Sequence, residues 1–242
     1  MRGAGAGAGA VGVAAALVLL AGCARGVEER QDAPGRAVKQ SPRATQAAAT
    51  RVIPGVGPTL RSRIPAGSRQ VVAVYGDGAE SADSAIVLYT RQGDLWKRER
   101  SWSGHNGKRG WTTDHHEGDK KSPVGVFTLS DAGGVLAEPG SRLPYHRSSA
   151  FAAPRSWSRS HWHDFDLVIA IDYNRVKGTS PLDPTRPQGQ SKGGGIWLHM
   201  DHGSGTSACV SQSKADMEYL LRTLDPALHP VVVMGDRAHL AA

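Results

Sequence analysis

Short apolar runs separated by turn-forming residues dominate the chain from residue 67 onward. Most of these runs are rich in Val, Ile and aromatic residues, and Gly, Pro, Asn or Asp residues lie between them. This pattern is typical of β-strands. The predicted strands span residues 70–75, 84–89, 95–99, 124–129, 167–172, 195–199 and 230–235.

One segment, residues 214–224, repeats apolar residues with the period of an α-helix. The residues on its apolar face are Met217, Leu220, Leu221 and Leu224. Ser213 and Asp216 are spaced like the two members of a capping box at its start. Many short strands and one helix predict a mostly β fold, a sandwich or barrel-like domain with one well-defined C-terminal helix.

The first 22 residues have the layout of an export signal. Arg2 supplies a positive charge, residues 11–20 form an apolar stretch, and Leu-Ala-Gly precedes Cys23. This order resembles a bacterial lipoprotein signal, in which the cysteine is diacylated and becomes the mature N-terminus. We therefore expect residues 1–22 to be removed and Cys23 to be the lipidation site.

The rest of the chain divides by composition into a tether and one domain. Residues 23–66 are rich in Arg, Ala, Gln and Pro and show little apolar periodicity, which predicts a flexible tether. Residues 67–238 are numerous enough to bury one good core, so we expect a single domain there.

The formal net charge of +7 changes this picture little. The basic residues are spread along the chain, and no nucleic-acid-binding motif accompanies them, so we expect no nucleic-acid partner.

Cysteine usage is more informative. Once Cys23 is lipidated, Cys209 is the only thiol. An unpaired cysteine in an exported protein is more often catalytic than one in a cytosolic protein, so we expect a catalytic role for Cys209.

The residues around Cys209 fit that role. An apolar strand ends on His199, a loop of glycine and hydroxyl residues follows, and the thiol comes shortly before the predicted helix. An imidazole and a helix N-terminus both lower the pKa of a thiol, and a lowered pKa makes it a better nucleophile. We expect Cys209 to be activated in this way.

Four segments together resemble the YkuD-type L,D-transpeptidase catalytic domain, in the compact branch found in exported actinobacterial proteins. The matching segments are residues 118–127, 172–174, 197–199 and 206–210, within a resemblance that runs from about 71 to 235. The resemblance implies a cysteine acyltransferase of peptidoglycan. Such enzymes attack a stem tetrapeptide, release its terminal D-alanine, and pass the acyl group to a side-chain amine of a neighbouring stem.

Carried onto this chain, the resemblance implies that Cys209 is the nucleophile and His199 the base. The backbone N–H groups of Ser207, Ala208 and Cys209 would form the oxyanion hole. Thr206 and His202 are secondary candidates; His202 lies on a glycine-rich loop, where a solvated histidine is as plausible as a functional one, and strand placement favours His199 as the base. No metal and no organic cofactor are expected.

The chain departs from the commoner family signature at three positions around the cysteine. Ser207 replaces a histidine, Ala208 replaces a glycine, and Ser211 replaces an arginine or asparagine. The glycine position matters most, because alanine adopts positive φ less readily. Two long irregular stretches, residues 145–162 and 177–194, are expected to line a binding cleft.

Other interpretations of the same residues remain open at this point. A serine hydrolase would use Ser204 or Ser207 with His202 and Asp201, although the Gly-x-Ser-x-Gly elbow is missing. A zinc peptidase or amidase would draw on the imidazoles in residues 161–164 and 199–202, although no helical His-Glu-x-x-His spacing organises them. A catalytically inactive peptidoglycan-binding lipoprotein and an L,D-carboxypeptidase are further alternatives.

The expected partners are peptidoglycan stem peptides and, through Cys23, the membrane. We expect a monomer on the outer face of the cytoplasmic membrane, facing the cell wall.

Overall fold

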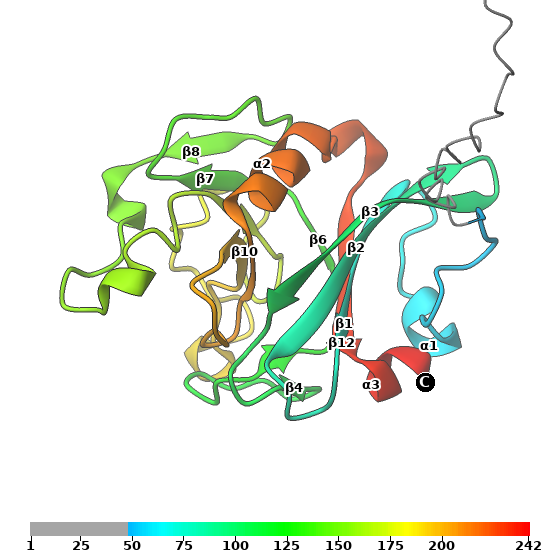
Figure 1. Cartoon of the computed structure of the whole chain (residues 1–242), viewed down its shortest axis with the longest axis horizontal. Coiled ribbons are helices and arrows are strands. Elements are labelled where there is room, and N and C mark those ends of the chain that lie inside the picture. The colour runs from blue at the N-terminus through cyan, green and yellow to red at the C-terminus, as the bar shows by residue number, and fades with distance from the viewer. Residues whose placement is uncertain (1–47) are drawn as a thin grey trace, which may run out of the picture. The chain divides into compact units, whose positions relative to one another are not determined.

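The fold is mostly β, as predicted, and is built around one mixed sheet of ten strands (Figure 1). It is seen in a computed structural model that describes residues 48–242. The strand order in the sheet is β6-β12-β1-β2-β3-β11-β10-β9-β7-β8. Their bounds are β1 Gln70–Gly76, β2 Asp83–Gln92, β3 Leu95–His105, β6 Gly125–Thr128, β7 Ala132–Gly134, β8 Tyr145–Arg147, β9 Val168–Ala170, β10 Trp197–Met200, β11 Val210–Gln212 and β12 Val231–Asp236.

The remaining elements are short. A small separate ladder joins β4 and β5, and three α-helices and four 3₁₀-helices complete the described chain. Their bounds are β4 Trp111–Thr112, β5 Ser122–Pro123, α1 Pro58–Arg61, α2 Lys214–Thr223, α3 Arg237–Ala241, η1 Ser149–Phe151, η2 Arg159–His161, η3 Gln190–Lys192 and η4 Pro226–Leu228. Among residues 48–242, no helix has the length and apolar character needed to cross a membrane.

The seven predicted strands are all present, within a few residues of their predicted ends except that β2 and β3 run further. The central strand β1 is buried along its whole length. Val72 and Val74 point into one apolar cluster, and Val71 and Ala73 point into another on the opposite face of the sheet. This period of two is what places a hydrophobic core on each side of the sheet.

The N-terminal part of the described chain belongs to the second of these cores, which corrects the predicted boundary of the tether. Ile53, Val56 and Leu60 are each at most 4% exposed, and Thr50 pairs with Trp96 as a bridge. Burying an aliphatic side chain stabilises a fold by about 1.5–3 kcal/mol. The folded unit therefore begins before residue 67. It also continues past residue 238, since α3 carries the buried Leu240.

Helix α2 is the predicted C-terminal helix, and it covers the other face of the sheet, near β10 (Figure 1). The Ser213 hydroxyl accepts a hydrogen bond from the Asp216 N–H at 3.2 Å, as a helix N-cap should. Met217, Leu220 and Leu221 are fully buried.

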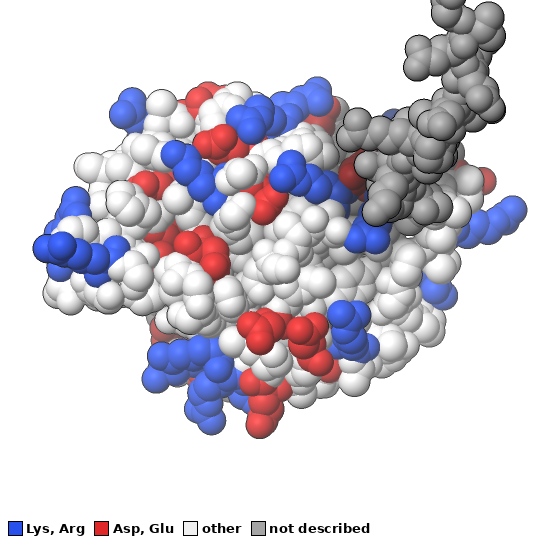
Figure 2. Space-filling view, viewed as in Figure 1, with Lys and Arg blue, Asp and Glu red and all other residues white. Residues whose placement is uncertain are grey.

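Charged side chains of both signs are spread over the folded unit. Figure 2 shows Lys and Arg interspersed with Asp and Glu across the face in view. The basic residues, which are spread along the sequence, are thus also spread over this face.

Candidate active site

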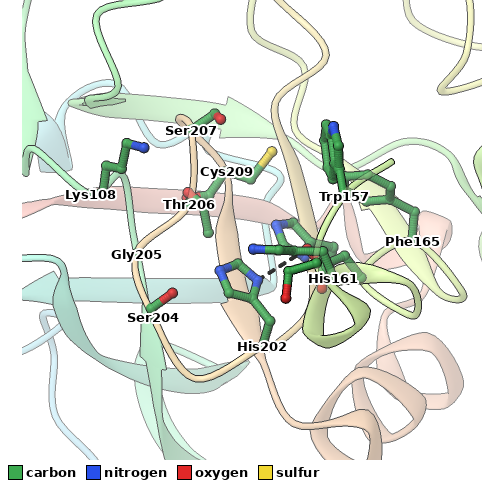
Figure 3. Close-up of a pocket in the computed structure, with 13 residues that line it drawn as sticks. Lys108, Trp157, His161, Phe165, His202, Ser204, Gly205, Thr206, Ser207 and Cys209 are labelled. Atoms are coloured by element: carbon green, nitrogen blue, oxygen red, sulfur yellow. Dashed lines mark hydrogen bonds and ion pairs between the residues drawn. The ribbon is translucent and has the colours of Figure 1, made fainter. Parts of the chain in front are cut away.

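Cys209 lies at the entry to β11, where two cavities meet. The larger, of about 470 Å³, is lined by Cys209 together with Trp157, His199 and His202. The smaller, of about 180 Å³, is lined by Cys209, Gly195 and neighbouring loop residues. Figure 3 shows the Cys209 sulfur directed into the larger cavity. The thiol can therefore be approached from two sides.

The main-chain carbonyl of Cys209 is held by hydroxyl groups. Thr206 Oγ1 donates to it at 2.7 Å, and Ser122 Oγ lies 3.1 Å from it and 2.7 Å from the Ala208 carbonyl. Ser122 Oγ also accepts the Gly107 N–H at 2.8 Å. Hydrogen bonds of this kind, made by buried groups, fix the conformation of the loop. No sequence pattern indicates this role of Ser122, which lies 87 residues away from the cysteine.

The backbone of Thr206 ties the same loop to the end of β3. Its N–H donates to the Asn106 carbonyl, and its carbonyl accepts the Lys108 N–H, both at 2.8 Å. Thr206 is 5% exposed. The secondary candidate Thr206 thus lines the larger cavity and holds the cysteine loop through both its hydroxyl and its backbone.

His199 lies on β10, the strand parallel to β11, and pairs in register with Ser211. Leu198 pairs with Val210. The residues that precede them in the chain are Trp197 and Cys209, and these two therefore lie side by side as well. His199 is 2% exposed and lines the larger cavity with Cys209. The structure therefore brings the predicted nucleophile and the predicted base to one cavity.

The imidazole of His199 has a defined tautomer. Its Nδ1 lies 2.8 Å from the Met200 carbonyl, which accepts hydrogen bonds only, so Nδ1 carries the proton and Nε2 has a free lone pair. Burial lowers the pKa of His199, although the Met200 hydrogen bond opposes this. A neutral imidazole with Nε2 unprotonated is the form that can accept a proton.

The thiol of Cys209 is not activated in the way its sequence context predicted. Burial raises its pKa to about 12, and the negative charge of Asp164 adds to this, while the Trp197 N–H opposes it. The prediction that a helix N-terminus lowers the pKa of the thiol is wrong, because β11 separates Cys209 from α2. The dipole effect falls off within the first turn of a helix, and the thiol lies outside that turn.

The predicted oxyanion donors are backbone N–H groups that no main-chain carbonyl accepts within the described residues. Within residues 48–242, the N–H groups of Ser207, Ala208 and Cys209 donate no backbone hydrogen bond. Ala208 is 8% exposed and has no positive φ, unlike Lys120, Asn174 and His229. An alanine therefore fits where relatives have glycine.

The sequence left open whether His202 is a solvated loop residue or a functional one. In the structure, it is not solvated. Its side chain is 4% exposed, and its Nδ1 lies 3.1 Å from Asp164 Oδ2. Its ring stacks on that of His199 with 6.4 Å between centroids. Asp201, by contrast, contacts Ser211 at 2.6 Å and His105 at 2.7 Å, so nothing supports a serine triad built on Asp201 and His202.

The two long irregular stretches line the cavities, as predicted. Trp157 and His161 come from residues 145–162 and line the larger cavity, and Gly194 of residues 177–194 lines the smaller one. Asp164 and Phe165, which follow the first stretch, also line the larger cavity.

The start of the second stretch is anchored by buried polar residues. Arg175 lies 3.0 Å from Asp131 and pairs with Asp172, and all three side chains are at most 4% exposed. The Asn174 side-chain amide donates to the Gly189 carbonyl at 3.0 Å. Because these contacts are buried, they hold the loop that forms the wall of the smaller cavity.

The sequence profile of the YkuD family, described as the L,D-transpeptidase catalytic domain, matches residues 55–233. The chain belongs to this family. Members of this family are cysteine L,D-transpeptidases that act on the cell wall outside the cytoplasm. The matched range begins before residue 67, in agreement with the packing of the N-terminal segment.

Among solved structures, the chain matches that of Bd1075 from Bdellovibrio bacteriovorus, with 17% sequence identity and a TM-score of 0.40. The match covers 70% of this chain and 48% of that chain, so this chain corresponds to about half of that protein's length. No curated protein matches the sequence.

Proposed function

We propose that this member of the YkuD family is a peptidoglycan L,D-transpeptidase in which Cys209 is the nucleophile and His199 the base. The observation that carries the proposal is the state of His199: a buried neutral imidazole whose Nδ1–H is held by Met200, on the wall of the cavity that contains the thiol. Its Nε2 is the proton acceptor in the proposal.

In the first half of the reaction, the thiol proton moves to His199 Nε2 as the sulfur attacks the carbonyl carbon of the donor stem. The carbonyl oxygen becomes an oxyanion, which the N–H groups of Ser207, Ala208 and Cys209 stabilise. When the tetrahedral intermediate collapses, His199 returns the proton to the departing amine. Free D-alanine leaves, and a thioester on Cys209 remains.

In the second half, a side-chain amine of a neighbouring stem attacks the thioester. His199 takes the proton of the amine and gives it to the departing thiolate, which restores the resting state. The two cavities that meet at Cys209 support this assignment, since an acyl transfer needs room for a donor and an acceptor. The raised pKa of the thiol makes proton transfer to His199 a required part of the attack.

The proposed setting is the outer face of the cytoplasmic membrane, with Cys23 as the lipid anchor and the chain as a monomer. Export and the lipoprotein signal rest on the sequence pattern alone, because residues 1–22 and Cys23 lie outside the described residues. The lipid would keep the domain next to the stem peptides that it cross-links.

Incubation of the purified protein with disaccharide tetrapeptides, followed by mass analysis, tests the proposal. A transpeptidase releases D-alanine and forms cross-linked dimers, and Cys209→Ser should do neither. Release of D-alanine without dimers would indicate the carboxypeptidase alternative. Binding of the substrate with no product in either variant would indicate the inactive lipoprotein.

A further inference from the structure

The wall of the larger cavity carries a cluster of three potential metal ligands that the proposed reaction does not use. His161 ends η2, Asp164 follows it, and His202 comes from the loop after β10. One ligand atom from each lies within 4.8 Å of the other two, and all three residues line the cavity. In Figure 3, His161 and His202 lie next to each other at one side of it.

The separations of the two histidines from Asp164 are close to those in a four-coordinate metal site. Asp164 Oδ2 lies 3.0 Å from His161 Nδ1 and 3.1 Å from His202 Nδ1. In a tetrahedral zinc site with bonds of about 2.0–2.1 Å, neighbouring ligand atoms are roughly 3.3 Å apart. Both separations from Asp164 are close to this value, and the two histidine nitrogens lie within 4.8 Å of each other.

The hydrogen bonding of the cluster is incomplete without such an ion. The side chains of Asp164 and His202 are each 4% exposed. Among the described residues, Asp164 Oδ1 and both ring nitrogens of His202 have no hydrogen-bond partner. The 3.1 Å approach of His202 Nδ1 to Asp164 is thus close but not aligned as a hydrogen bond. Buried polar groups in this state are uncommon, and a missing ion is one physical explanation for them.

We propose that His161, Asp164 and His202 bind one divalent transition-metal ion, with Zn²⁺ the best fit, in the cavity that also contains Cys209. Two imidazoles and one carboxylate are a donor set that zinc takes in sites with an open fourth position. Because all three residues line the cavity, the open position faces it. The ligand class that it takes is water or a carboxylate oxygen. This site goes beyond the proposed acyl transfer, which uses none of the three residues.

The test is zinc binding by the purified full-length protein, made without a polyhistidine tag. After equilibrium dialysis against zinc chloride and a weak competing chelator, elemental analysis should find about one zinc per chain, as expected for a single site. Asp164→Asn and His202→Gln should each weaken the affinity at least tenfold, because each removes one ligand. His163→Gln is the matched control, since His163 is 74% exposed and pairs with Asp166. It should bind zinc as the wild type does.

Thermal melting of the metal-free variants establishes that they are folded, and zinc should raise the melting temperature of the wild type and of His163→Gln only. The site is overturned if the wild type retains no zinc, or if Asp164→Asn retains it with unchanged affinity. Those results would identify the cluster as a set of ion pairs around Asp164.

A cobalt-loaded sample separates this site from the proposed catalytic thiol. Cobalt bound by the three proposed ligands gives visible absorption without a thiolate charge-transfer band, and Cys209→Ser should give the same spectrum. A thiolate band that disappears in Cys209→Ser would replace the proposed ligand set with one that includes Cys209. Since Cys209→Ser should lose acyl transfer and keep zinc, failure of one proposal leaves the other measurable.

Discussion

The backbone N–H of Trp197 donates a hydrogen bond to the Cys209 sulfur at 3.4 Å. The thiol therefore contacts β10, the strand that also contains His199. This contact lowers the thiol pKa, but burial outweighs it and raises the pKa to about 12. At neutral pH the thiol is therefore protonated. In the proposed mechanism, acylation then requires His199 as the proton acceptor, and this requirement predicts a specific pH dependence.

The pH dependence of acylation should differ between the wild type and His199→Ala. In the wild type, burial lowers the pKa of His199 below the ordinary value of 6.5, so His199 is neutral at neutral pH and the rate should fall only in the more acidic range where the imidazole becomes protonated. In His199→Ala the thiolate must form unaided, so the rate should rise steadily with pH up to the raised thiol pKa. Stopped-flow measurement of acylation across pH gives both profiles.

At neutral pH, His199→Ala should acylate about 10²- to 10⁴-fold more slowly, the range for losing a positioned base. His202→Ala serves as the comparison, because its ring lies in the same cavity, and it should cost much less. The reverse ranking in a single-turnover assay would assign the role of base to His202.

Thr206→Val tests the support of the cysteine loop. It removes the 2.7 Å hydrogen bond to the Cys209 carbonyl while keeping the shape of the side chain. We expect a loss of about 1 kcal/mol in the free energy of unfolding and, because the thiol is less well positioned, a roughly tenfold slower acylation. Ser207→Ala is the control, since Ser207 is exposed and its proposed contribution is a backbone N–H. Equal acylation by both variants would show that the Thr206 hydroxyl does not position the thiol.

Leu60→Ala tests whether the N-terminal segment is part of the folded unit. Leu60 is 4% exposed in the core that α1 shares with β1 and α3. Its truncation should lower the free energy of unfolding by about 2–5 kcal/mol in urea titrations. Val52→Ala, at a side chain that is 42% exposed, should change it by less than about 0.5 kcal/mol. Similar unfolding curves for both variants would instead support a tether that extends to residue 66.

Seven strands could be predicted because their apolar residues reflect the two cores, whereas the short strands β4, β5, β7, β8 and β11 were not predicted. Strand β11 was missed for a physical reason: it has three residues, and two of them, Ser211 and Gln212, are polar yet fully buried. Their polar groups are satisfied by Asp201 and Trp102 rather than by water. A short strand of this kind has no apolar period, and its pairing with β3 and β10 is fixed by tertiary structure.

Tertiary structure also limits what the sequence can predict about the site. The sequence indicates the candidate residues but not the direction in which the pKa of the thiol shifts. Cys209 and His199 stand out in the sequence, but the direction of the thiol pKa depended on burial and on the strand that separates it from α2. The grouping of Asp164 with His202 brings together residues 38 positions apart, and no local spacing indicates it.

Cys23→Ser tests the anchor. If Cys23 carries two acyl chains, the wild type should fractionate with membranes and the serine variant should be released, because dual acylation gives stable attachment. Globomycin-type inhibition of the lipoprotein signal peptidase should give an unprocessed precursor of the wild type. Cys23→Ser protein that stays with the membrane to the same extent as the wild type would contradict the lipid anchor.

The last prediction concerns Cys209 itself. Family resemblance implies acylation by carbapenems, whose strained carbonyl imitates the acyl donor and leaves the drug bound to the sulfur. The chain should gain one carbapenem per molecule, on Cys209, since Cys23 is the only other cysteine and is expected to be lipidated. Peptide mapping after digestion locates the adduct.

Cys209→Ser should abolish the adduct and the cross-linking together, because serine preserves the size of the side chain and removes the nucleophilic sulfur. Unchanged thermal melting would show that the fold is intact, as expected because serine can replace the sulfur in its hydrogen bonds with Trp197 and Gly195. Ser204→Ala is the control, since Ser204 lines the same cavity from the exposed loop and should keep both activities. Cross-linking that persists in Cys209→Ser and disappears with a chelator would contradict the cysteine mechanism. It would assign the chemistry to a metal ion bound by His161, Asp164 and His202.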